Sequence, residues 1–170
     1  MSAARPRARV RIETRGPAAA AVLAALHERV FAADTGERWS TGDLHAILRV
    51  PGIACLLART GDVPCGYALL RCAADEAELL SIGVEPAFQS QGIGRQLMAA
   101  VRAHCAGLGV TRLFLEVRER NIRACRFYRR LGFAETGRRR DYYRRSCGAR
   151  EDAITMSLDF APECSSTAPQ

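Results

Sequence analysis

The 170-residue sequence contains no lysine, no long hydrophobic run and no CxxC pair. All 25 of its basic residues are arginine, a composition from which no chemistry follows by itself. The longest apolar stretch, Pro17 to Leu26, gives way to His27-Glu28-Arg29 and is far shorter than the roughly 20 residues that a membrane-spanning helix needs. We therefore expect a soluble protein without a membrane partner.

The seven cysteines are an odd number, and no two of them are separated by only two residues. Disulfide frameworks use even numbers of cysteines, and zinc knuckles use closely spaced pairs. We expect reduced, mostly buried thiols in a cytoplasmic protein, and no metal site. These cysteines are Cys55, Cys65, Cys72, Cys105, Cys125, Cys147 and Cys164.

With 48% hydrophobic and 25% charged residues, a chain of this length can bury one core. We expect a single domain over residues 1–160 and a disordered tail over 161–170. The first eleven residues hold four arginines and no acid, but no apolar run with a cleavage site follows them. We interpret them as a basic start that leads into a strand, and not as a targeting peptide.

The net charge of +7 is distributed unevenly along the chain. The segment Arg112–Arg150 holds thirteen arginines against four acids, whereas residues 151–170 hold four acids and no arginine. A local basic surplus can bind RNA, a ribosomal surface or a polyanionic cofactor, or it can be a solvated face. The charge alone does not choose among these readings.

Hydrophobic periodicity and capping residues predict an α/β domain with a mixed sheet, antiparallel at first and with a strand-helix-strand crossover near the middle. The predicted strands span residues 7–14, 53–59, 65–71, 77–84, 111–118, 133–139 and 153–160. The predicted helices span residues 18–31, 94–108 and 121–131, together with a short helix that Ser40 or Thr41 caps and that ends at Leu48.

A glycine-rich loop, Gln89-Ser90-Gln91-Gly92-Ile93-Gly94-Arg95, lies between a predicted strand and a predicted helix. Glycines let the backbone approach a ligand closely, and the free N–H groups of a helix N-terminus favour an anion. Arg95 adds positive charge, and Ser90 or Gln91 can donate hydrogen bonds. The loop matches neither a Walker loop nor a GxGxxG fingerprint. It predicts a pyrophosphate site, with a plain helix-starting turn as the alternative.

Gln89, Gly92 and Gly94 fit the pattern Arg/Gln-x-x-Gly-x-Gly/Ala, so the loop resembles the acetyl-CoA signature of the GNAT family of N-acetyltransferases. Further motifs in the same order narrow the resemblance to the RimI-type ribosomal-protein alanine N-acetyltransferases. Those motifs are Gly83-Val84-Glu85-Pro86, Leu115-Glu116-Val117-Arg118, Asn121, Phe127-Tyr128, Leu131-Gly132-Phe133, Tyr142-Tyr143 and Glu151-Asp152-Ala153-Ile154. The resemblance covers residues 78–158, and Gly83 stands where members of the family often carry Ala.

The resemblance implies a GNAT-like fold, in which a mixed, mostly antiparallel central sheet has a splayed pair of strands and is flanked by helices. It also implies acetyl-CoA as co-substrate. The strand Ile82-Gly83-Val84 is then expected to separate from its neighbour, so that its free backbone groups bind the pantetheine arm and the thioester oxygen. The remaining residues implied to bind acetyl-CoA are Ser90, Gln91, Gly92, Ile93, Gly94, Arg95 and Asn121, of which Asn121 also caps a helix.

The resemblance further implies that Glu116 is the general base and Tyr128 the general acid. We expect Glu116 to lie among apolar neighbours of its strand, where burial makes a carboxylate a better proton acceptor; pairing with Arg118 or Arg123 is the alternative. Tyr128 follows twelve positions later, and a phenol is protonated at neutral pH, so it can donate to a departing thiolate. Ordinary aromatic packing is the alternative for Tyr128.

Several other polar residues remain outside the predicted site. The three histidines, His27, His45 and His104, have no partner spacing and are interpreted as surface or core residues. Tyr142-Tyr143 and Glu151-Asp152 can line the acceptor cleft, but they can equally shape the last hairpin.

The predicted function, as the resemblance implies, is transfer of acetyl from acetyl-CoA to the N-terminal alanine of a small-subunit ribosomal protein. Other protein N-termini, lysines or small amines are alternative acceptors, and a non-catalytic CoA-binding or RNA-binding module is the alternative from another class. The Arg-rich segment would repel a basic peptide unless acids such as Asp34 and Glu37 line the acceptor groove, and it would suit ribosomal or RNA contact.

Overall fold

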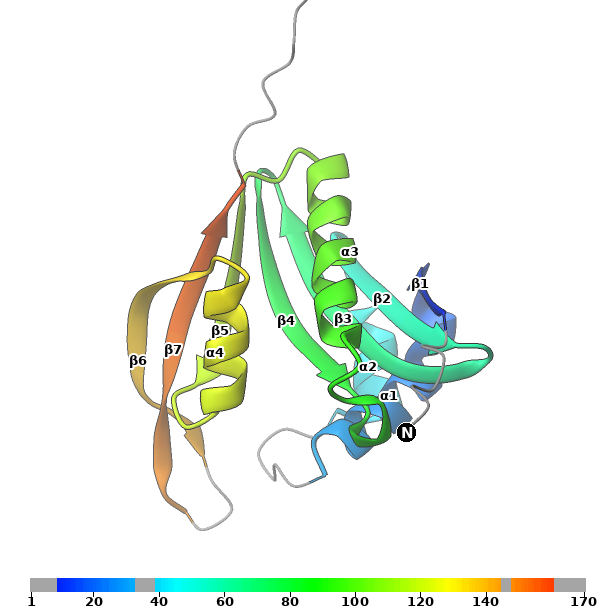
Figure 1. Cartoon of the computed structure of the whole chain (residues 1–170), viewed down its shortest axis with the longest axis horizontal. Coiled ribbons are helices and arrows are strands. Elements are labelled where there is room, and N and C mark those ends of the chain that lie inside the picture. The colour runs from blue at the N-terminus through cyan, green and yellow to red at the C-terminus, as the bar shows by residue number, and fades with distance from the viewer. Residues whose placement is uncertain (1–8, 33–38, 145–147, 161–170) are drawn as a thin grey trace, which may run out of the picture.

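The computed structural model describes residues 9–32, 39–144 and 148–160. Seven strands form one sheet in the order β1-β2-β3-β4-β5-β7-β6, and helices cover parts of both faces (Figure 1). Every neighbouring pair of strands is antiparallel except β4 and β5, which are parallel. This arrangement confirms the predicted mixed, mostly antiparallel α/β fold.

Each predicted strand and helix is present. The strands are β1 (Val10–Arg15), β2 (Ile53–Thr60), β3 (Val63–Ala73), β4 (Glu76–Val84), β5 (Arg112–Arg118), β6 (Ala134–Arg144) and β7 (Arg150–Asp159). The helices are α1 (Ala20–Val30), α2 (Thr41–Ile47), α3 (Ile93–Gly107) and α4 (Ile122–Arg130), with single 3-10 turns at η1 (Pro17–Ala19) and η2 (Pro86–Phe88). The last two strands extend farther toward each other than the sequence predicts.

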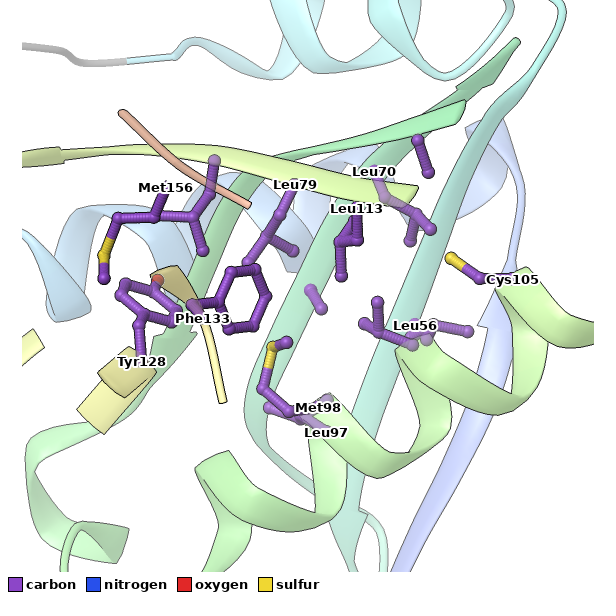
Figure 2. Packing of buried hydrophobic residues seen from close by; sticks show 14 of the residues in the cluster. Leu56, Leu70, Leu79, Leu97, Met98, Cys105, Leu113, Tyr128, Phe133 and Met156 are labelled. Carbon is purple, nitrogen blue, oxygen red and sulfur yellow. The ribbon is translucent and has the colours of Figure 1, made fainter. Parts of the chain in front are cut away.

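Helices α3 and α4 cover one face of the sheet because each presents an apolar stripe to it. In α3 the stripe recurs at helical spacing and is buried, and its side chains meet those of β2, β3 and β5 (Figure 2). Each fully buried aliphatic side chain in such a core contributes roughly 1.5–3 kcal/mol relative to an exposed one. The stripe consists of Ile93, Leu97, Met98, Val101 and Cys105.

Helices α1 and α2 cover the opposite face, over β2, β3 and the middle of β4. Ser40 starts α2 with a capping box, as the sequence predicts. Its hydroxyl oxygen accepts from the Asp43 N–H at 3.1 Å, and the Asp43 carboxylate accepts from the Ser40 N–H at 2.9 Å. Leu44 of α2 is thereby buried against Leu23 and Leu26 of α1 in a second core.

The parallel pair β4 and β5 stays together for only four residues of each strand. Pairing runs from Glu76 opposite Arg112 to Leu79 opposite Leu115, and then stops. Beyond that point β4 continues with β3 and β5 continues with β7, so the two strands diverge into a V (Figure 1). Leu80 is an extra residue in β4 at the point of divergence, a β-bulge that bends the strand. The splayed strand pair implied by the resemblance is thus present.

Some sequence predictions fall outside the described residues, namely the disordered tail 161–170 and the acids Asp34 and Glu37. The boundary of the single domain at residue 160 therefore stays a prediction. In the portion of the chain that the structure describes, no helix is long and apolar enough to cross a membrane.

Candidate active site

A cleft with a volume of about 160 Å³ lies between the diverging ends of β4 and β5. It brings together four of the residues that the sequence predicts for the site: Ile82, Glu116, Asn121 and Tyr128. The rest of its wall comes from α1 and the residue after it, from the segment just before α2, and from β4, β5, α4 and β6. These other residues are His27, Phe31, Trp39, Leu79, Leu80, Ser81, Val117, Arg118, Ala124 and Tyr143.

Glu116 lies on β5 with its side chain 20% exposed, and its Oε1 forms an ion pair with the Nε of Arg139 at 2.9 Å. The strand neighbours of Glu116, Leu115 and Val117, are buried and apolar as expected. Among the described residues its charged partner is Arg139, whereas Arg118 pairs with Glu151 and Arg123 bonds Gln89, so the alternative partners were wrong. Arg139 lies on β6 beside Ala153 of β7, and its long side chain reaches past that small residue to β5. Within the described residues Oε2 has no partner, so this oxygen is the one that can accept a proton.

Tyr128 lies on α4 with 7% of its surface exposed. Its ring packs against Phe127 and, edge to face at 5.6 Å, against Phe133 (Figure 2). Burial, with smaller contributions from Cys125 and Tyr143, raises the pKa of the Tyr128 phenol above its usual range. No described residue hydrogen-bonds the hydroxyl. Tyr128 is therefore both a core residue and a protonated donor that lines the cleft.

The glycine-rich loop folds as an anion site requires. Ser90 and Gly92 both have positive φ, +62° and +83°, and Gly92 caps α3 in the left-handed conformation that glycine adopts without strain. No side chain caps α3, and in the described residues the N–H groups of Ile93, Gly94 and Arg95 have no acceptor. The side chain of Ile93 is buried in the core, whereas Ser90, Gln91 and Arg95 are exposed.

Gln89 fastens this loop to both walls of the cleft. Its Nε2 donates to the carbonyl of Val84 at 3.1 Å, and its Oε1 accepts from Arg123 of α4 at 2.6 Å. The first turn of α3 consequently lies beside the end of β4 and beside α4, the elements that also line the cleft. Ile82, Gly83 and Val84 pair with β3 along one edge of β4, and no strand of the described residues pairs with them along the other edge.

Asn121 and Gly83 each have a structural reason for their residue type. The Asn121 side-chain oxygen accepts from the Ala124 N–H at 3.0 Å, so Asn121 caps α4 as predicted while also lining the cleft. At Gly83 an added Cβ would come within 2.7 Å of Val30 and 3.2 Å of Tyr67. Val30 of α1, and less severely the Tyr67 ring, crowd the position of a Cβ here, so the alanine that the resemblance leads one to expect would force Val30 to shift.

Other residues line the cleft without belonging to the predicted site; among them is Tyr143, for which lining the cleft was one of two expectations. His27 is 5% exposed, and its ring stacks on Trp39 with centroids 4.9 Å apart. Arg118 lies over the ring of Tyr143 at 4.2 Å and pairs with the buried carboxylate of Glu151 at 3.7 Å. No local spacing marks these residues, because each contact joins segments distant in the sequence. The RimI-type motifs do include Arg118, Tyr143 and Glu151, and that was the one available signal.

Part of the surplus of the basic segment is balanced by acids that follow it in the sequence. Arg112 pairs with Asp159, Arg118 with Glu151 and Arg138 with Asp152. Contact with RNA therefore stays a prediction. Five cysteines fall in the described residues and all are free thiols, four of them buried, as expected. The described residues contain no group of three or more His, Cys, Asp and Glu side chains arranged to hold a metal ion.

Comparison with known proteins agrees with this geometry. The profile of the Acetyltransferase (GNAT) family matches residues 22–133. The [Ribosomal protein bS18]-alanine N-acetyltransferase of Escherichia coli K12 is 37% identical over 134 residues, which is 79% of this chain and 80% of the relative. The N-alpha-acetyltransferase RimI of Mycobacterium tuberculosis is 39% identical over 140 residues, 80% of this chain and 84% of the relative.

Among solved structures, the ribosomal-protein-S18-alanine N-acetyltransferase of Escherichia coli superposes with a TM-score of 0.81 and 30% identity. The superposition covers 92% of this chain and 98% of that one. The sequence profile, the relatives and the splayed sheet agree on one assignment. The chain belongs to the GNAT family of acetyltransferases.

Proposed function

We propose that this protein transfers an acetyl group from acetyl-CoA to the N-terminal amine of a protein. The observation that carries the proposal is a single cleft, between the diverging strands β4 and β5, that is lined by both Glu116 and Tyr128. Membership of the GNAT family supports acetyl-CoA as the acetyl donor.

The residues present fit acetyl-CoA. Three N–H groups at the start of α3 have no acceptor among the described residues, and together with the positive end of the helix dipole they suit a pyrophosphate. We assign this role to the backbone of Ile93, Gly94 and Arg95, with Ser90, Gln91 and Gly92 in the preceding turn. The free edge of β4 at residues 82–84 can hydrogen-bond an extended pantetheine arm in the way that it would bond a neighbouring strand. Asn121 lies opposite that edge, and its side-chain N–H groups are not used by the helix cap.

The transfer needs proton movements that these side chains can perform. The acceptor ammonium must lose a proton before its nitrogen forms a bond to the acetyl carbon, and Oε2 of Glu116 can take that proton directly or through water. As the carbon–sulfur bond breaks, the Tyr128 hydroxyl can give its proton to the thiolate. A backbone N–H of β4 directed at the thioester oxygen would stabilise the developing oxyanion by about 3–4 kcal/mol, the usual worth of such a donor.

The proposed acceptor is the N-terminal alanine of the small-subunit ribosomal protein bS18. Support comes from the Escherichia coli relative, whose name states that activity and which covers four fifths of this chain. Other N-termini, lysines and small amines are competing acceptors for the same cleft. A cytoplasmic location, where nascent ribosomal proteins and acetyl-CoA meet, fits the free thiols of the described cysteines.

The test is acetylation of purified, unmodified bS18, followed by mass spectrometry of its N-terminal and lysine-containing peptides. Acetyl on the N-terminal alanine alone would support the proposal. Acetyl on lysine side chains alone, or none on any bS18 peptide while acetyl-CoA binds, would contradict the proposed acceptor.

A further inference from the structure

A chain of buried hydrogen bonds connects α1 to the cleft through Tyr67. The Tyr67 hydroxyl is 2.7 Å from Nδ1 of His27 and 2.8 Å from the hydroxyl of Ser81. Tyr67 has no exposed surface, and burial raises the pKa of its phenol above the usual range, so it stays protonated. Both His27 and Ser81 line the cleft, and neither has a role in the mechanism above.

The bulge at Leu80 determines the face of the sheet on which Ser81 lies. Leu79 and Ile82 pack into the core under α3 and α4, whereas Leu80 packs against the core under α1 and α2. Ser81 bonds Tyr67 of that second core, so the extra residue turns two consecutive side chains toward the α1 and α2 face. Without the bulge, strict alternation would place Leu80 and Ser81 on opposite faces.

Glu116 lies on the same face as Ser81. Its neighbours Leu115 and Val117 pack into the core under α3 and α4, so the alternation of β5 directs Glu116 to the other face. The free N–H groups of α3, by contrast, belong to the α3 and α4 layer. An acetyl donor held by α3 therefore reaches the cleft from one face, and Ser81 and Glu116 meet an acceptor that enters from the other.

We propose that Ser81 is an acceptor-binding residue, and that Tyr67 and His27 are positioning residues that orient its hydroxyl. This inference rests on the proposed function, because it concerns the amine that receives the acetyl group. When Nδ1 of His27 carries no proton, Tyr67 donates to His27 and Ser81 donates to Tyr67. The remaining lone pairs of the Ser81 oxygen then accept an N–H of the acceptor ammonium, on the opposite wall of the cleft from Glu116.

The test compares Ser81→Ala, Ser81→Thr, Tyr67→Phe and the double variant Tyr67→Phe/Ser81→Ala in steady-state kinetics with an Ala-Arg peptide. Ser81→Ala should raise the KM of the peptide at least about tenfold, the lower end of what one hydrogen bond to a charged group contributes. Ser81→Thr keeps the hydroxyl and should restore the KM to within about threefold of the wild type. The affinity for acetyl-CoA should not change in any variant.

A double-mutant cycle separates positioning from a general loss of stability. If Tyr67 acts through Ser81, Tyr67→Phe should raise the peptide KM in the wild-type background and add nothing in the Ser81→Ala background. Thr60→Val is the matched control, since it removes a part-buried hydroxyl that contacts Cys65 away from the cleft. This control should leave the peptide KM unchanged while the melting temperature shows its effect on stability.

A peptide KM for Ser81→Ala within about twofold of the wild type would overturn the proposal, as would equal effects of Tyr67→Phe in both backgrounds. Should Tyr67→Phe fail to fold, the comparison of Ser81→Ala with Ser81→Thr still decides the role of Ser81. If the proposed function itself is wrong, the result is distinguishable, because the wild-type protein would then leave the peptide unmodified and acetylate another amine. The same variants are in that case measured with the amine that the wild type accepts.

Discussion

Replacing Tyr128 with Phe should separate turnover from stability. The Tyr128 hydroxyl has no hydrogen-bond partner among the described residues, so its removal leaves no buried group unsatisfied. The ring, which carries the packing against Phe127 and Phe133, remains in place. We expect the free energy of unfolding to change by less than about 1 kcal/mol, whereas Tyr128→Ala would cost about 3–5 kcal/mol through the cavity that it leaves. Turnover with Tyr128→Phe should nevertheless fall by about 10² or more, equivalent to about 2.7 kcal/mol of transition-state stabilisation.

Two assays on the same preparation check this prediction. Thiol release from acetyl-CoA gives kcat, and thermal unfolding gives the change in stability. Because burial raises the pKa of Tyr128, the phenol stays protonated above pH 10, and the alkaline fall of wild-type kcat due to this group should begin above that pH. Turnover of Tyr128→Phe within about threefold of the wild type would refute the assignment of Tyr128 as the acid.

Three further predictions concern the base, the loop and the thiols. Glu116→Gln should lower kcat by about 10² or more without weakening acetyl-CoA binding. The control Glu135→Gln, at an exposed carboxylate, should change neither kcat nor acetyl-CoA affinity. Near-normal turnover of Glu116→Gln would exclude Glu116 as the base. Gly92→Ala places a Cβ on a residue with φ +83°, a conformation that strains an alanine. The variant should unfold with about 1–2 kcal/mol less free energy and bind acetyl-CoA more weakly. An unchanged melting temperature and an unchanged acetyl-CoA affinity would contradict the prediction. Burial raises the pKa of Cys55 to about 11 and that of Cys105 to about 12. Iodoacetamide at pH 8 should therefore modify these two thiols much more slowly in the native protein than in urea, as measured by peptide mapping. Equal rates of modification in both conditions would disprove their burial.

Much of the fold follows from local pattern. The apolar spacing of α3 and the Ser40–Asp43 capping box are signals contained within one or two helical turns, and both elements form as expected. The length of β6 was not predictable in the same way. Nearly all its residues are exposed, so no hydrophobic alternation marks the strand, and pairing with β7 alone determines where it ends.

In the candidate site, too, local motifs were predictable and contacts between distant segments were not. The loop, Glu116 and Tyr128 were identified by motifs, because those residue types and spacings occur together in one family. The partner of Glu116 was not identified, because Arg139 comes near Glu116 only in the folded sheet, where the strand order is β5-β7-β6. The bond between His27 and Tyr67 joins residues 40 positions apart, and periodicity carries no information about such a contact.

Acetylation of a free N-terminal amine is the activity that we propose for this protein. The most direct measurement is thiol release from acetyl-CoA by the purified protein, with a peptide beginning Ala-Arg compared with the same peptide already N-acetylated. We expect release with the free amine and none above background with the blocked peptide. Equal release with both peptides, or none with either while acetyl-CoA remains bound, would contradict it.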